Sequence, residues 1–117
     1  MAKYLYRLNY TEAGLEGTIK EGFANREAFF RKTVTGLGGT TEAAYWAYGD
    51  TDIFIVVDLP DAEKATGLSL TLATTGAFEV STTTLLTAAA MDAGARKMPG
   101  YRAPGADADS RGRPGAQ

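Results

Sequence analysis

The chain has 117 residues, of which 44% are apolar, and its 12 basic and 14 acidic side chains nearly balance. This length suits one small domain with its own core, and the balanced charge predicts no nucleic-acid or membrane partner, since neither sign forms a long run. Cysteine and histidine are both absent, which excludes disulfides, thiolate or imidazole metal sites and His-based catalytic triads.

The amino-terminal third predicts a strand followed by a long, broken helix. Residues 3–10 alternate in the period-two pattern of a strand, and Thr11 is a good N-cap for a helix over roughly residues 12–37. Apolar residues recur there at helical spacing, as Leu15, Ile19, Phe23, Phe30, Val34 and Leu37. We expect this stripe to face the core and the helix to break near Gly22, because each interior glycine costs about 1 kcal/mol relative to alanine.

The middle of the chain predicts a hairpin. Strands over residues 40–48 and 51–59 are joined by a two-residue turn, which places Trp46 opposite Ile53. Tyr45 then lies on the other face of the sheet from Trp46, because successive strand side chains point in opposite directions.

The second hairpin strand is unusual because residues 53–57, with the sequence Ile-Phe-Ile-Val-Val, are apolar on both faces. A single-layer sheet with a solvated back does not need a second apolar face. We therefore expect another subunit to cover it, which makes the protein a homodimer or a larger homo-oligomer.

The remaining sequence completes a known supersecondary pattern. Asp61 caps a second helix, residues 78–86 form a Thr-rich strand, and Thr87 caps a short Ala-rich helix. The order βαββαβ predicts an α+β, ferredoxin-like fold, with a four-stranded antiparallel sheet and two helices on one face. Proline and glycine are frequent after Met98, so we predict a domain over residues 1–97 and a tail over residues 98–117.

A series of short motifs follows in a fixed order along residues 3–97. They are Tyr4 to Thr11, Arg26, Leu37-Gly38-Gly39, Tyr45-Trp46, Gly49, Asp52, Pro60-Asp61 and Leu86-Thr87. In this series the chain resembles the GYD-domain family of small bacterial and archaeal proteins. The resemblance implies a ferredoxin-like fold of the dimeric α+β barrel type, with two sheets back to back, and it implies no established reaction. One position differs, since Thr51 stands where the family usually has a tyrosine before the aspartate of its naming motif.

Five residues are candidates for a small-molecule site: Tyr6, Arg26, Tyr45, Trp46 and Asp52. The aromatic side chains suit a flat organic ligand, although aromatic residues at strand spacing also arise from packing alone. Arg26 offers a planar fork for a carboxylate, or it ties the broken helix to the sheet. Asp52 is either a general base or a structural carboxylate that pairs with Arg26 or a backbone amide. We predict no metal and no cofactor.

Two functions are consistent with these observations. The first is a cytoplasmic, non-enzymatic or accessory protein, a homo-oligomer that either binds a small apolar or aromatic molecule or acts as an assembly unit; no signal peptide or membrane span is predicted. The second is a cofactor-independent enzyme, a monooxygenase or isomerase, with Asp52 as its base, Arg26 as an anion anchor and the aromatic candidates as the cavity wall. A closed cavity between helices and sheet into which Asp52 or Arg26 points would favour the enzyme, and a filled interior would count against it.

Overall fold

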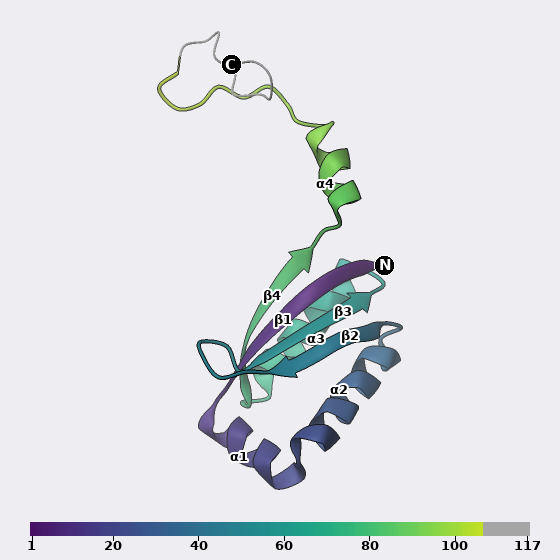
Figure 1. Cartoon of the computed structure of the whole chain (residues 1–117), viewed down its shortest axis with the longest axis vertical. Helices are drawn as coiled ribbons and strands as arrows, with labels where there is room; N and C mark the ends of the chain where they lie inside the picture. Colours follow the sequence, from purple (N-terminus) through teal and green to yellow (C-terminus); the bar gives the residue numbers. More distant parts are fainter. Residues whose placement is uncertain (107–117) are drawn as a thin grey trace. The chain divides into compact units, whose positions relative to one another are not determined.

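The computed structural model describes residues 1–106, so residues 107–117 of the predicted tail lie outside the described residues. The elements are β1 (Ala2–Tyr10), α1 (Glu12–Glu21), α2 (Phe23–Gly36), β2 (Thr40–Trp46), β3 (Ile53–Leu59), α3 (Ala62–Thr74), β4 (Phe78–Leu85) and α4 (Ala88–Ala95) (Figure 1). The chain divides into two compact units, Met1–Leu85 and Leu86–Gln117.

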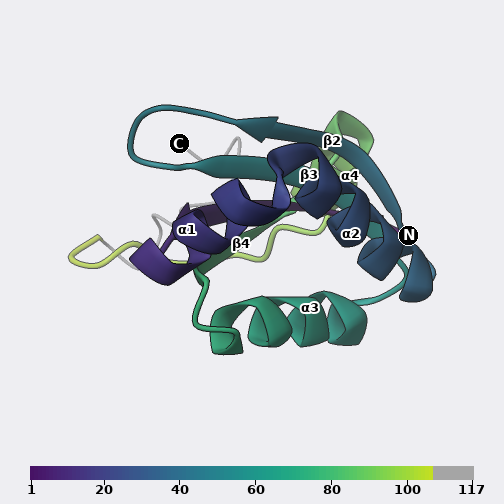
Figure 2. The ribbon, with the colours of Figure 1, turned by 90° about the horizontal axis from the view of Figure 1, so that it is seen from below.

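The first unit has the predicted ferredoxin-like α+β fold. Its four strands form one antiparallel sheet in the order β2-β3-β1-β4. Helices α2 and α3 lie on the same side of this sheet, α2 over β2 and α3 over β4 (Figure 2). Trp46 pairs with Ile53, which confirms the predicted hairpin register.

The core lies between the helices and one face of the sheet, called here the inner face. It consists of Tyr4, Tyr6, Leu8, Val34, Ile53, Ile55, Val57, Leu59, Ala65 and Leu68. Every second residue of β1 and β3 contributes, as the period of a strand requires. Tyr6 is the largest fully buried side chain, and its hydroxyl donates a hydrogen bond to the carbonyl oxygen of Ala65 at 2.6 Å. Burial raises the pKa of the Tyr6 phenol above its ordinary value.

The long first helix is broken at Gly22, as predicted. Gly22 has a φ of 101°, a conformation that favours glycine, and it stands between α1 and α2. Its N–H donates to the carbonyl of Thr18 at 2.7 Å, and its own carbonyl accepts from the N–H of Arg26 at 3.0 Å. A single residue therefore ends one helix and begins the next.

The predicted apolar stripe of the long helix faces the core at Phe30, Val34 and Leu37, but the prediction is wrong for the first half of the stripe. Leu15, Ile19 and Phe23 are 40%, 63% and 41% exposed, whereas Gly14 and Thr18 are buried. Gly14 of α1 packs against the backbone of Ala77, the residue before β4. A Cβ atom added at Gly14 would collide with that backbone. The smallest residue thus sets which face turns inward, and the apolar residues point elsewhere.

The hairpin loop is longer than predicted. β2 ends at Trp46 and β3 begins at Ile53, so residues 47–52 form the connection, although the N–H of Ala47 still donates to the carbonyl of Asp52 at 2.9 Å. Instead of extending the ladder with β2, the backbone N–H of Asp52 donates to the carbonyl of Leu8 in β1. The connection is therefore attached to the central strand.

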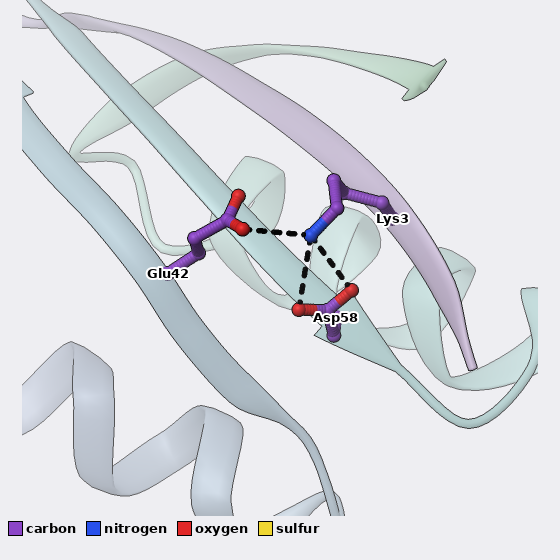
Figure 3. Close-up of polar contacts among 3 residues, drawn as sticks. All are labelled: Lys3, Glu42 and Asp58. Carbon is purple, nitrogen blue, oxygen red and sulfur yellow. Dashed lines mark hydrogen bonds and ion pairs between the residues drawn. The ribbon is translucent and has the colours of Figure 1, made fainter. Parts of the chain in front are cut away.

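The second face of the sheet, called here the outer face, carries an apolar centre with a polar end. Leu5, Ala43 and Val56 are half-buried there, while Tyr45 and Phe54 are 69% and 37% exposed. At one end, the ammonium of Lys3 lies 3.0 Å from a carboxylate oxygen of Glu42 and 3.0 Å from one of Asp58 (Figure 3). These contacts raise the pKa of Lys3, the hydrogen bond to Glu42 first and that to Asp58 second.

The second unit contains α4, whose N-cap is Thr87, as predicted. The hydroxyl of Thr87 accepts a hydrogen bond from the backbone N–H of Ala90 at 3.1 Å. Along residues 1–106, every helix is too short or too polar to cross a membrane.

Candidate functional site

A cavity of about 380 Å³ lies between the inner face of the sheet and the helices. Leu68 and Leu72 of α3 and Ile55 of β3 form part of its lining. Five aromatic rings complete the apolar wall, those of Tyr10, Phe29, Phe30, Trp46 and Phe78. Both the size and the apolar lining are typical of sites that hold small organic molecules.

A second, shallower hollow of about 540 Å³ lies beside this cavity. It is lined by Tyr10, Leu15, Phe23, Trp46, Ala47, Tyr48 and Asp52. Leu15 of α1 and Phe23 of α2, which were expected in the core, therefore line this outer hollow instead. Tyr10 and Trp46 belong to both linings, so these two side chains lie at the boundary of the inner cavity and the outer hollow.

The wall between the two spaces is held in place by specific contacts. The indole Nε1–H of Trp46 donates a hydrogen bond to the hydroxyl oxygen of Tyr10 at 2.9 Å. The ring of Phe23 meets the Trp46 ring edge-on, with centroids 6.0 Å apart and planes at 90°. The ring of Tyr10 packs on Phe78 at a centroid distance of 5.6 Å. Contacts of this kind fix aromatic rings in orientation as well as position.

Two arginines of α2 line the inner cavity, and each is paired with a carboxylate. Arg26 lies 3.1 Å from Glu21 across the helix break, and its guanidinium lies 4.8 Å from the centroid of the Phe29 ring. Arg31 lies 2.9 Å from Glu27 and also donates to the carbonyl of Thr41. The positive charge that these side chains bring to the cavity is thus balanced locally.

The structure brings three of the five predicted site residues to this region. Arg26 and Trp46 line the inner cavity, and Trp46 and Asp52 line the outer hollow. Tyr6 is buried within the core below, and Tyr45 lies on the opposite face of the sheet. Two of the aromatic candidates, Tyr6 and Tyr45, therefore do not reach this region.

Asp52 pairs with a backbone amide, one of the structural partners expected for it. Its Oδ2 accepts a hydrogen bond from the N–H of Tyr10 at 2.9 Å. Its own N–H donates to the side-chain oxygen of Asn9, also at 2.9 Å. Within residues 1–106, no group of three or more acidic, histidine or cysteine residues could hold a metal ion.

Tyr10 is not among the five candidate site residues, although it lines both spaces. The available signal was its alternation with Tyr6 and Leu8, which places it on the inner face at the last residue of β1. A polar aromatic residue at the end of a strand, beyond the fully buried positions, lies where a core opens into a cleft.

Comparison with known proteins gives one match. The family model described as the GYD domain matches residues 4–95, which include every residue that lines the two spaces. No curated protein and no solved structure matches the chain.

Proposed function

The chain belongs to the GYD-domain family, and from this premise we propose that it is a homo-oligomeric module that binds a small apolar or aromatic molecule and serves an accessory role. The observation that carries the proposal is the inner cavity of about 380 Å³ with its five aromatic rings. Such rings combine a large apolar contact area with few rotatable bonds, which favours flat organic ligands.

Self-association is the second part of the proposal, and the apolar centre of the outer face supports it. Leu5, Val56 and Phe54 form this centre, and none of the three helices of the first unit packs on that side. Burying apolar area contributes roughly 25 cal/mol per Å², so even a modest contact offsets part of the cost of association. Two sheets packed through this face would form the dimeric α+β barrel expected from the resemblance.

Native mass spectrometry of protein purified from its source tests both parts at once. We expect the mass of at least a dimer, together with a retained small molecule that is released when the protein unfolds. A monomer without any bound molecule would contradict the proposal.

A matched pair of variants tests the interface directly. Phe54→Glu places a carboxylate in the apolar centre of the outer face and should dissociate the oligomer, because an unpaired buried charge is costly. Leu70→Glu makes the same kind of change on the exposed surface of α3 and should leave the oligomer intact. Sedimentation velocity measures both, and equal masses for the two variants would argue against this interface.

The enzyme alternative has one observation in its favour, which is that Arg26 lines the inner cavity. Its proposed base, Asp52, lines only the outer hollow and is bonded to the backbone of Tyr10. Asp52→Asn tests whether Asp52 is a catalytic base or a structural carboxylate. Loss of turnover on a substrate found in a small-molecule panel would support the enzyme. Unchanged turnover would exclude Asp52 from catalysis.

A further inference from the structure

Tyr10 carries a hydroxyl group at the wall of the inner cavity. Its ring is held by Phe78 on one side, and its hydroxyl oxygen is held by the indole N–H of Trp46 at 2.9 Å. Trp46 is itself fixed by the edge-on contact with Phe23. The phenol therefore has a set orientation before any ligand arrives, which lowers the entropic cost of binding.

The proton of this hydroxyl is not engaged by the protein. A phenol has one donor and can also accept, and the bond from Trp46 uses only its accepting capacity. Among residues 1–106, no side chain or backbone carbonyl accepts a hydrogen bond from the Tyr10 hydroxyl. The donor remains for water or for an acceptor atom of a ligand, and most of the surrounding wall is apolar.

The charged residues of the cavity disfavour an anionic ligand. Arg26 is paired with Glu21, and Arg31 is paired with Glu27. A ligand carboxylate would have to share a guanidinium with one of these acidic side chains, and the repulsion between the two neighbouring carboxylates costs free energy. A neutral ligand leaves both ion pairs in place.

From these three observations, we propose that the inner cavity selects an uncharged ring compound with a carbonyl-type acceptor, which accepts a hydrogen bond from the Tyr10 hydroxyl. This inference rests on the small-molecule binding proposed above and specifies the class of ligand. Tyr10 acts as a binding residue, and Trp46 orients it.

A titration with three matched probes tests the inference on the full chain. Indane has only the ring, 1-indanone adds a carbonyl, and 1-indanecarboxylate adds a negative charge. Trp46 is the one tryptophan of the chain, so its indole N–H gives a single NMR signal from the wall of the cavity. We expect 1-indanone to bind about three- to tenfold more tightly than indane, as one net hydrogen bond allows, and the carboxylate to bind more weakly than the ketone.

Substitution of Tyr10 by Phe identifies the donor. Tyr10→Phe removes one oxygen and keeps the ring on Phe78, so the preference for 1-indanone over indane should disappear while indane still binds. Tyr101→Phe removes the same group from an exposed tyrosine of the second unit and should keep the preference.

The possible results separate the two proposals. Equal binding of indane and 1-indanone by the wild type would overturn the assignment of Tyr10 and leave small-molecule binding intact. A preference that survives Tyr10→Phe would do the same, provided that the indole N–H signal of Trp46, which this variant frees, shows no hydrogen bond to the ketone. Tightest binding of the carboxylate would overturn the selection for an uncharged ligand. Failure of all three probes to move the Trp46 signal would count against small-molecule binding itself, and this inference would fail with it.

Discussion

Asp52 and Tyr10 are joined by a hydrogen bond of 2.9 Å between the Oδ2 of the aspartate and the backbone N–H of the tyrosine. The bond connects the loop over residues 47–52 with the end of β1. It also holds the backbone of Tyr10, whose side chain lines both the inner cavity and the outer hollow. The aspartate therefore contributes to the site by fixing the position of Tyr10.

Removing this carboxylate should destabilise the fold. We expect Asp52→Ala to lower the free energy of unfolding by about 1–2 kcal/mol, because the half-buried Tyr10 amide loses a charged acceptor. Asp52→Asn should cost less, since its amide oxygen can still accept. Urea unfolding measures both variants. Asp50→Ala, an exposed change in the same loop, should shift stability by less than about 0.5 kcal/mol; equal losses at both positions would refute a specific role for Asp52.

Two glycines of α1 should respond in opposite ways to the same substitution. Gly14→Ala should cost about 1–3 kcal/mol or more, because the new methyl group collides with the backbone of Ala77. Gly17→Ala should stabilise the protein by about 0.5–1 kcal/mol, because that position is open and alanine is the better helix former. Thermal unfolding measures the stability of both variants, and each serves as the control for the other. An unchanged stability of Gly14→Ala would show that α1 is free to move away from Ala77.

Local chemistry made much of the fold predictable. The helix break at Gly22, the caps at Thr11, Asp61 and Thr87, and the pairing of Trp46 with Ile53 each depend on a few neighbouring residues, and the structure has all of them. The apolar periodicity of α1 led to a wrong prediction. It correctly indicates an apolar face on this helix, but it does not determine which face of the helix packs on the core. That choice depends on how closely Gly14 approaches Ala77, a contact between residues 63 positions apart.

The candidate site was less predictable because its residues meet only through the tertiary fold. Trp46 was selected for its type, and it does line the cavity. Tyr6 was also selected for its type, yet its position in the middle of β1 buries it completely. Residue type thus suggests which side chains can form a ligand site, and the position along the strand decides which of them reach the cavity.

The cluster of Lys3, Glu42 and Asp58 predicts a loss of stability at alkaline pH. Its two carboxylates raise the pKa of Lys3 in the folded state. A raised pKa stabilises the fold below the ordinary lysine pKa of about 10.4, and this contribution disappears as the pH rises through the folded value. Unfolding midpoints from pH 8 to pH 11 should fall less steeply for Lys3→Met than for the wild type. Lys32→Met, at an exposed position of α2, should follow the wild type; an unchanged slope in Lys3→Met would exclude this linkage.

Tyr6 should make a separate contribution to the same alkaline transition. Burial raises the pKa of its phenol, so above about pH 10 the unfolded chain ionises this group more readily than the folded protein, and stability falls as the pH rises. Tyr6→Phe should reduce that slope but also cost about 1 kcal/mol at neutral pH, because the hydrogen bond to the carbonyl of Ala65 is lost. Tyr101→Phe is the control, since this tyrosine is exposed. If Tyr6→Phe lowered stability equally at pH 7 and pH 11, the hydrogen bond would account for the whole effect and the ionisation of Tyr6 for none of it.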